Sequence, residues 1–300
     1  MKVIVFGGAG LLGRAIATEL RSHGHQVVTA GRTGCDVVVD YRFDNTPELF
    51  ADLVRGADIV VNAAGILIER ADNTFAAVHV AAPRALFQAC ATQRVARIVH
   101  ISSLGVGTGM AGAYMASKLA AEQALQEGSV DYAIVRPALL VDAACPSTLL
   151  FQSLAKLPLI ALPGLLHPGA SLVAPIQVQD VAEAVTRMCE HPKALRRTIE
   201  LAGPEVMTYK TMLQRYREAT RPEAGKGLVL WLPLPWWLMK ATALLAAHLP
   251  QSVFSIDTMR MLQAGSVPQS NEALYWLRHM PKPAVAQQHI AGEAMKIAVI

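Results

Sequence analysis

Short apolar runs alternate with amphipathic stretches along the first 140 residues of the chain. A buried parallel strand is apolar on both faces, whereas a helix that packs on a sheet repeats its apolar residues every three to four positions. Strands separated by helices need crossover connections, and these produce a parallel sheet covered on both faces. The predicted strands are Val3–Phe6, Gln26–Ala30, Ile59–Asn62, Arg97–Ile101 and Tyr132–Arg136, and the predicted helices are Leu11–Ser22, Glu48–Arg55, Thr74–Gln93 and Ala113–Leu125.

After Pro137 the pattern becomes irregular, and Pro, Leu and Gly are frequent between residues 145 and 175. Helical spacing returns at Asp180–Cys189 and at Thr208–Thr220, where a Thr cap opens the second helix. Thr198–Leu201 has the composition of a strand.

These elements predict an α/β fold built on a doubly wound parallel sheet. Residues 1–140 would form this sheet domain, and residues 141–300 would form a smaller, mostly helical C-terminal lobe. We expect the lobe to bind the substrate and to pack on the edge of the sheet as part of one continuous unit.

Composition excludes several classes of protein. The chain has 300 residues, 53% of them apolar, so a large core is possible, and its net charge of +4 comes without a run of Lys or Arg that would suit nucleic acid. The four cysteines are scattered without metal-ligand spacing, which predicts reduced thiols and no metal site. The N-terminus lacks the pattern of a signal peptide, and we therefore expect a cytoplasmic protein.

Two segments of the C-terminal part are strongly apolar, Leu149–Leu166 and Leu228–Pro250. The second is long enough to cross a bilayer, but prolines, a lysine and a histidine interrupt it, so no transmembrane helix is predicted. It would form a buried pair of helices over the substrate cleft, a Trp-bearing surface resting on the inner face of a membrane, or a subunit interface. Both segments favour an apolar small-molecule substrate over a sugar nucleotide. No oligomeric state is predicted.

A glycine-rich turn directly follows the first predicted strand and opens the first helix. Gly7, Gly10 and Gly13 give the spacing G-x-x-G-x-x-G. Glycines allow the backbone to turn tightly and to approach a diphosphate without a Cβ in the way. The amides of Leu11, Leu12 and Gly13 at the helix start would then face the phosphates, as in a Rossmann-type dinucleotide site.

The end of the second strand bears on the choice of dinucleotide. An enzyme that uses NAD usually has an Asp or Glu here, which accepts hydrogen bonds from the adenosine ribose. This chain has Arg32 instead, and a guanidinium suits a 2′-phosphate. NADP(H) is therefore favoured, with NAD(H) left open. Asp40 would lie near the adenine.

Polar groups at later positions suggest proton-transfer chemistry. Tyr114 and Lys118 are four residues apart in a predicted helix and share a face. An ammonium beside a phenol would lower the phenol's pKa, and it would also reach the ribose of the nicotinamide. Ser103, or less favourably Ser102, follows the fourth strand and would orient a substrate oxygen.

The order of these motifs resembles the short-chain dehydrogenase/reductase superfamily in its extended or atypical branch, and the likeness covers nearly the whole chain. It includes the motif Asn62-Ala63-Ala64-Gly65 at the end of the third strand, of which the resemblance assigns Ala63, Ala64 and Gly65 to the cofactor site. Arg136-Pro137 looks like the strand-end pair that this branch has beside the nicotinamide. Later similarities are Pro175–Val181 and Leu201–Pro204.

A narrower likeness connects Gly65-Ile66-Leu67, Val99–Gly105 and the Leu-Pro-Leu-Pro segment with bacterial relatives of the Rossmann-fold accessory subunit of respiratory complex I. That subunit family implies NADPH binding with a structural rather than a catalytic role. Two positions depart from the extended branch: His79 stands where an Asn is frequent, and Asp142-Ala143 stands near the place of a Gly-Pro pair.

The leading hypothesis is an NADP(H)-dependent oxidoreductase that acts on a carbonyl or alcohol of an apolar substrate. Tyr114 would transfer the proton, Lys118 would tune the phenol, and Ser103 would hold the oxygen. One alternative is a non-catalytic NADP(H)-binding assembly factor, sensor or membrane-complex subunit. Another is a sugar-nucleotide epimerase or dehydratase of the same branch.

Overall fold

The computed structural model describes residues 1–109, 112–163, 165, 171–220, 229–240 and 255–285. The chain divides into two compact units. Unit 1 comprises Met1–Pro137, Val178–Leu201 and Gln269–Met280, and unit 2 comprises Ala138–Gln177, Ala202–Pro268 and Pro281–Ile300. The chain therefore returns twice to unit 1 after residue 140, so the two units are not consecutive stretches of sequence.

Unit 1 contains a seven-stranded sheet with the order β11-β6-β5-β4-β1-β2-β3. All of its pairings are parallel, as the predicted crossovers require. The strands are β1 (Lys2–Phe6), β2 (Gln26–Gly31), β3 (Val37–Val38), β4 (Ile59–Asn62), β5 (Arg97–Ile101), β6 (Asp131–Pro137) and β11 (Arg197–Leu201).

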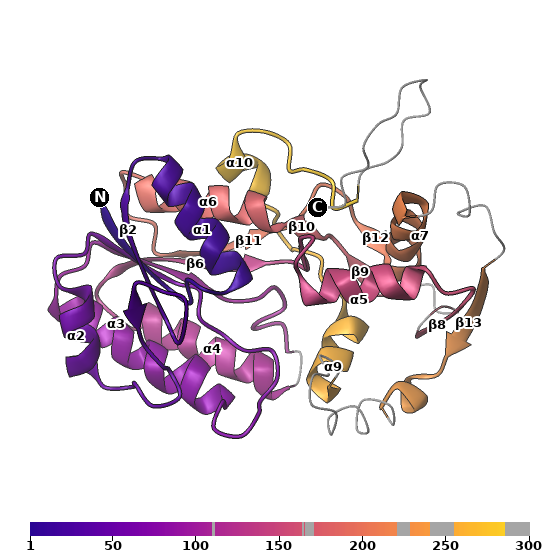
Figure 1. Ribbon diagram of the computed structural model, residues 1–300, viewed down its shortest axis with the longest axis horizontal. Coiled ribbons are helices and arrows are strands. Elements are labelled where there is room, and N and C mark those ends of the chain that lie inside the picture. Colours follow the sequence, from indigo (N-terminus) through magenta and orange to yellow (C-terminus); the bar gives the residue numbers. More distant parts are fainter. Residues whose placement is uncertain (110–111, 164, 166–170, 221–228, 241–254, 286–300) are drawn as a thin grey trace. The chain divides into compact units, whose positions relative to one another are not determined.

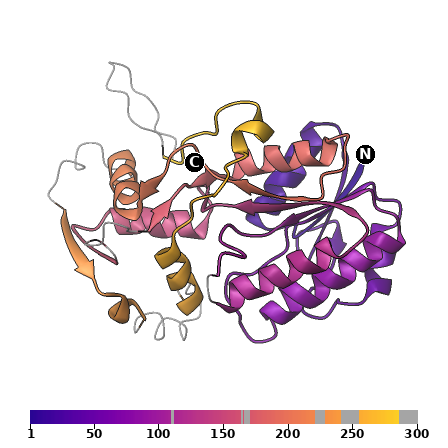
Figure 2. The ribbon, with the colours of Figure 1, turned by 180° about the vertical axis from the view of Figure 1, so that it is seen from behind.

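Helices cover both faces of this sheet (Figures 1 and 2). Ile4 and Phe6 of β1 pack with Phe50, Leu86 and Leu125 from the helices on one face. This arrangement confirms the predicted doubly wound α/β fold. One face carries α1 (Leu11–Ser22) and α6 (Val178–Glu190), with α10 (Ala273–Leu277) beside α6, and the other carries α2 (Pro47–Val54), α3 (Ala82–Thr92) and α4 (Ala113–Gln126).

The predicted long helix Thr74–Gln93 is present from Ala76 to Thr92, but its first half is not an α-helix. The chain forms a π-helix, η1 (Ala76–Ala81), which continues into α3. Pro83 explains the change, because its ring lacks an N–H and would clash with the carbonyl four residues earlier. The wider turn avoids this clash, and the amide of Ala82 bonds to the carbonyl of Ala77, five residues back.

Unit 2 is built from helices and short two-stranded sheets. Thr208 Oγ1 accepts a hydrogen bond of 3.1 Å from the amide of Thr211, which confirms the predicted Thr cap. Tyr216 and Met212 of the capped helix lie in the core of the unit with Ile160 and Val173. The elements are β7 (Leu140–Val141), α5 (Pro146–Ala155), β8 (Leu159–Pro163), β9 (Leu172–Val173), β10 (Ile176–Gln177), β12 (Met207–Thr208), α7 (Tyr209–Thr220), β13 (Leu230–Leu234) and α9 (Ile256–Ala264).

The apolar segment Leu228–Pro250 differs from the expected pair of buried helices. Residues 230–234 form β13, which pairs in parallel with β8, and Pro233 disfavours a helix at this place. Residues 236–240 are helical. Leu230 and Trp237 are exposed. Leu228 and residues 241–250 lie outside the described residues, as do Gly164 and Leu166 of the first apolar segment. Among the helices that the structure describes, none has both the length and the apolar character needed to cross a bilayer.

All four cysteines fall within the described residues and carry free thiols, as the sequence predicted. Cys90, Cys145 and Cys189 are buried, whereas Cys35 is partly exposed. Burial raises the pKa of the Cys189 thiol to about 12, so this group stays protonated at neutral pH.

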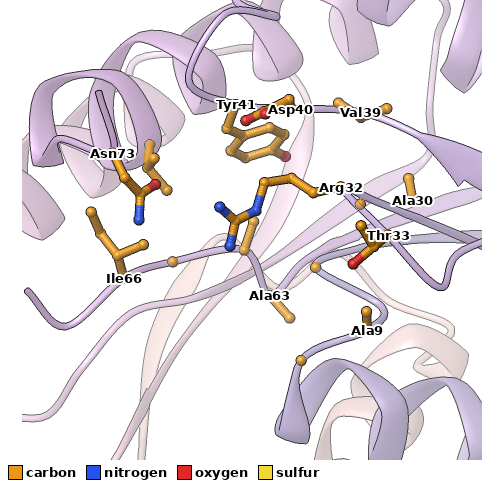
Figure 3. Close-up of a pocket in the computed structure, with 16 residues that line it drawn as sticks. Ala9, Ala30, Arg32, Thr33, Val39, Asp40, Tyr41, Ala63, Ile66 and Asn73 are labelled. Atoms are coloured by element: carbon orange, nitrogen blue, oxygen red, sulfur yellow. The ribbon is translucent and has the colours of Figure 1, made fainter. Parts of the chain in front are cut away.

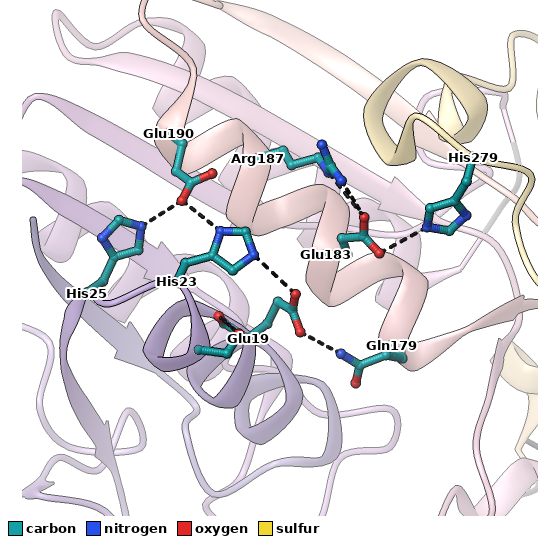
Figure 4. Close-up of polar contacts among 9 residues, drawn as sticks. Glu19, His23, His25, Gln179, Glu183, Arg187, Glu190 and His279 are labelled. Atoms are coloured by element: carbon teal, nitrogen blue, oxygen red, sulfur yellow. Dashed lines mark hydrogen bonds and ion pairs between the residues drawn. The ribbon is translucent and has the colours of Figure 1, made fainter.

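A polar cluster links α1 and α6 within unit 1 (Figure 4). Glu190 Oε1 lies 2.9 Å from both His23 Nδ1 and His25 Nε2. His23 also contacts Glu19, whose other oxygen accepts from Gln179 at 2.7 Å. Burial raises the pKa of the Glu190 carboxyl, but the hydrogen bonds from the two histidines outweigh it and hold the pKa below 4.5. The ionised carboxylate therefore stabilises the contact between the helices.

We predict that Glu190→Gln lowers the melting temperature at neutral pH by about 2 °C, and that this difference disappears near pH 3. A carboxyl with a depressed pKa stabilises the folded state above its unfolded pKa and loses that effect as the pH falls through the folded value. Circular dichroism melts over this pH range measure the effect. Glu127→Gln, at an exposed position, is the matched control. A deficit that persists unchanged at the acidic end would contradict the assignment.

Candidate functional site

The strand order reverses next to β1, because the chain proceeds from β1 to β2 and β3 and then returns to place β4 on the other side. Open parallel sheets bind ligands at the carboxyl ends of the strands beside such a switch point. A pocket of about 340 Å³ lies here within unit 1. Its lining includes Gly7, Ala9 and Gly10 after β1, Arg32 and Thr33 after β2, Val39–Tyr41, and Ala63–Ile66 after β4.

The glycine turn is closely packed against the backbone around it. Gly7 has φ +78°, and a Cβ there would lie 2.6 Å from the amide nitrogen of Ala64. A Cβ on Gly13 would lie 2.1 Å from the carbonyl oxygen of Gly7. Both positions therefore require glycine, whereas at Gly10 the nearest atom would be 3.1 Å away.

The start of α1 fits the diphosphate of a dinucleotide. The N-cap residue, Gly10, makes no side-chain hydrogen bond to the first turn, and that turn contains no acidic residue. The first amides of a helix lack carbonyl partners within it and carry the positive end of the helix dipole. The side chain of Leu12 is buried, so the contribution of this residue to a phosphate site would come from its backbone.

Arg32 and Asp40 both line the pocket, where the sequence predicted cofactor contacts. The guanidinium of Arg32 points into the pocket beside the ring of Tyr41 (Figure 3). Arg42 holds the carboxylate of Asp40 with bonds of 3.0 and 2.9 Å from Nε, and these hydrogen bonds hold the pKa of Asp40 below 3.8. The ionised carboxylate of Asp40 is thus paired with Arg42, and Arg32 supplies the positive charge in the pocket.

Asn62 is a buried support of this pocket that the sequence analysis mentioned only as part of a motif. Its Oδ1 accepts from Tyr41 Oη at 3.2 Å and from the amide of Ala64 at 3.3 Å. Its Nδ2 lies 3.2 Å from His100 Nδ1. One amide side chain therefore fixes two walls of the pocket, the loop after β4 and the ring of Tyr41.

The structure brings Ser103 and Tyr114 together, as the sequence predicted. A side-chain hydrogen bond joins the two, and Tyr114 is buried at the start of α4. The predicted lowering of the Tyr114 pKa is wrong for the protein alone. Burial raises the pKa of the phenol above 10, and the bond with Ser103 only partly opposes this effect. The phenol is therefore protonated at neutral pH and can donate a proton.

Lys118 lies one helical turn after Tyr114 and is buried. Its Nζ donates to the carbonyl of Ile101 at 3.1 Å, and a Cβ on Gly65 would lie 3.2 Å from the same atom. Burial lowers the pKa of Lys118 to about 8, and the nearby Glu122 carboxylate opposes this shift. The ammonium is thus next to the loop after β4, where Gly65 lines the pocket.

Ser102 and Arg136 belong to a buried hydrogen-bond network centred on Glu122. Glu122 accepts from Ser102 Oγ at 2.5 Å and from Arg136 Nε at 2.9 Å. This network connects the ends of β5 and β6 to the helix that carries Tyr114. The sequence analysis missed Glu122, although its i+4 spacing from Lys118 was a usable signal. It assigned Arg136 and the buried Pro137 to the cofactor, and that role stays a prediction.

Comparison with known proteins places these residues in a wider group. The family model for the NAD dependent epimerase/dehydratase family matches residues 3–202. The matched span contains the glycine turn, Ser103, Tyr114 and Lys118, and it confirms the resemblance predicted from the order of the motifs.

Two curated relatives match this chain at identities below 30% over the aligned residues. A ceramide reductase from Caulobacter vibrioides is 29% identical over 244 residues, which cover 78% of this chain and 74% of the relative. The mitochondrial NADH dehydrogenase [ubiquinone] 1 alpha subcomplex subunit 9 of Arabidopsis thaliana is 28% identical over 223 residues, which cover 68% of this chain and 54% of that subunit. The chain thus spans about half the length of this relative.

Among solved structures, the NADPH-dependent quinone oxidoreductase of Escherichia coli, complexed with NADPH, superposes with a TM-score of 0.72. It is 16% identical, and the match covers 94% of this chain and 96% of that one. At this identity the likeness concerns the fold, and it agrees with the doubly wound sheet.

We predict that Gly13→Ala lowers the melting temperature and abolishes NADPH binding, because its Cβ would overlap the carbonyl of Gly7. Gly10→Ala is the matched variant. With φ −68° and a Cβ 3.1 Å from the carbonyl of Gly7, it should lower the melting temperature less than Gly13→Ala, yet its methyl group in the pocket lining should weaken NADPH binding about tenfold. Thermal melts and fluorescence titration with NADPH measure both effects. Wild-type affinity in Gly13→Ala would contradict the assigned phosphate site.

Proposed function

Because the chain belongs to the NAD dependent epimerase/dehydratase family, we propose that it is an NADPH-dependent reductase that acts on a carbonyl group of an apolar small molecule. The observation that carries this proposal is geometric: Tyr114 and Lys118 lie one turn apart on α4, and a side-chain hydrogen bond joins Tyr114 to Ser103. A buried, protonated phenol is a proton donor, which is what the reduction of a carbonyl requires.

The pocket residues support NADPH as the cofactor. The amides at the start of α1 would hold the diphosphate, Arg32 would bind the 2′-phosphate, and Val39–Tyr41 would border the adenine. The carboxylate of Asp40 is engaged by Arg42, which leaves it poorly suited to accept from a ribose hydroxyl. The loop Ala63–Gly65 and the neighbouring Lys118 would hold the nicotinamide end.

When bound, NADPH supplies a hydride to the carbonyl carbon. Tyr114 donates its phenolic proton to the substrate oxygen, which then becomes the hydroxyl of the product alcohol. Ser103 holds that oxygen in line with the phenol. The phenolate that remains is stabilised by the Lys118 ammonium until solvent returns the proton.

An apolar substrate is supported by unit 2 itself. Leu149 and Leu150 of α5, Leu157 in the connection after it and Leu159 of β8 are all at least 40% exposed. Such an apolar surface suits an apolar small molecule better than a sugar nucleotide, which needs charged and polar contacts. The name of the ceramide reductase relative agrees with a lipid-like carbonyl or alcohol. A non-catalytic NADPH-binding subunit is the second candidate, favoured by the 28% identity to the complex I subunit.

We predict that Arg32→Ala weakens NADPH binding by about tenfold to a hundredfold and changes NADH binding by less than about twofold, because only NADPH has a 2′-phosphate for the guanidinium to bind. Isothermal titration calorimetry with both nucleotides measures the split. The control is Arg55→Ala, which removes an exposed guanidinium paired with Asp52. Equal losses for the two nucleotides would reject the 2′-phosphate assignment.

We predict that Tyr114→Phe lowers kcat at least about a hundredfold and leaves the Kd for NADPH within about twofold, since only the proton donor is lost. A panel of long-chain ketones and aldehydes, followed by the loss of NADPH absorbance, supplies the assay. Tyr275→Phe, at an exposed position on α10, is the control. An unchanged kcat in Tyr114→Phe rules out the proposed proton donor. NADPH binding without turnover of any substrate favours the non-catalytic candidate.

A further inference from the structure

His79 is a buried residue of η1 that the proposed chemistry does not use, and its side chain is 2% exposed. Its Nε2 accepts a hydrogen bond of 3.0 Å from the amide of Ile66, in the loop after β4. Its Nδ1 lies 2.9 Å from Ser117 Oγ. Ser117 Oγ in turn donates to the carbonyl of Tyr114 at 2.7 Å.

These contacts determine the tautomer. A backbone amide can only donate, so Nε2 must be the unprotonated nitrogen of the ring. A neutral imidazole then carries its proton on Nδ1 and donates it to Ser117, whose own proton is used by the Tyr114 carbonyl. The three bonds form one directed chain from the amide of Ile66 to the first turn of α4, where Tyr114 lies.

The imidazole also packs against the rings around it. It stacks on Phe75 with a centroid distance of 5.2 Å, and it meets the Tyr114 ring edge to face at 5.6 Å. A Cβ on Gly65 would lie 3.3 Å from His79 Nε2 and 3.2 Å from Lys118 Nζ. Gly65 therefore lies between the imidazole and the ammonium, with no spare room for a side chain.

The surroundings keep the ring uncharged. Burial lowers the pKa of His79 to about 2, and the positive charge of Lys118 and the nearby His100 add to the effect. His100 is itself buried, and its pKa falls to about 3. A second cation beside Lys118 would be repelled, so the imidazole of His79 does not take up a second proton in the physiological range.

We propose that His79, as the neutral tautomer protonated on Nδ1, is a positioning residue that holds the Gly65–Ile66 edge of the nucleotide pocket in register with the turn of α4 that bears Tyr114. The inference rests on the proposed function, since it assigns His79 to the same site. It assigns two separable tasks to one side chain: Nε2 holds the pocket edge, and Nδ1 holds the turn that aims the phenol.

Two amide substitutions separate these tasks. The amide group of Gln can reach the place of Nε2, so His79→Gln keeps an acceptor for Ile66 and loses the donor to Ser117. The amide group of Asn lies near the place of Nδ1, so His79→Asn keeps the donor and loses the acceptor. We expect His79→Gln to lower kcat at least about tenfold with little change in the Kd for NADPH, and His79→Asn to raise that Kd at least about tenfold.

Ser117→Ala tests the hydrogen bond between His79 Nδ1 and Ser117 from the side of its partner. It should reproduce the kcat loss of His79→Gln, and combining it with His79→Gln should add little, because both remove the same link. His23→Gln, in the polar cluster between α1 and α6, is the surface control and should keep both constants. Equal losses of affinity and kcat in the Gln and Asn variants would overturn the two-task assignment.

A spectroscopic measurement tests the tautomer without any assay of activity. Imidazole ¹⁵N shifts of the wild-type protein should show His79 protonated on Nδ1 alone and unchanged between about pH 5 and pH 8. An imidazole protonated on Nε2, or one that titrates in this range, would overturn the inference. If the tautomer and the NADPH affinities are as expected but no carbonyl compound is reduced, the proposed reductase activity fails while the positioning role stands.

Discussion

The nucleotide pocket depends on backbone packed directly against backbone at the carboxyl end of β1. With a Cβ on Gly13, the methyl carbon would lie 2.1 Å from the carbonyl of Gly7, and with one on Gly7 it would lie 2.6 Å from the amide of Ala64. Only because both side chains are absent can α1 begin so close to β1, with the end of β4 alongside. The resulting space is bordered by Gly7, Ala9 and Gly10 of the turn on one side and by Ala63–Ile66 on the other.

The elements that create this constraint were the ones most accessible to sequence analysis. The bounds of α1, β4 and β5 agree with the predicted ranges to the residue, because each is a continuous buried run or a regular helical repeat with a clear end. Glycines mark the turn, and Ser103, Tyr114 and Lys118 could be placed from motif order alone. The match over residues 3–202 agrees with that order.

Features that depend on tertiary packing were not predictable in the same way. The π-helix η1 follows from how Pro83 fits against the preceding turn, and β13 pairs with a strand whose isolated sequence shows no alternation. The direction of the Tyr114 pKa was wrong, because it depends on how deeply the phenol is buried rather than on the spacing to Lys118. Burial of this kind also explains why His79 is an uncharged part of the site.

The proposed site would combine, within unit 1, a phosphate cradle at the glycine turn, the guanidinium of Arg32 at the adenosine end, and Tyr114 and Lys118 one helical turn apart on α4. A crystal structure of the protein grown with NADPH tests it most directly. The diphosphate should lie against the amides of Leu11–Gly13, with the 2′-phosphate on Arg32. Side chains filling this pocket, or NADPH bound elsewhere on the molecule, would contradict it.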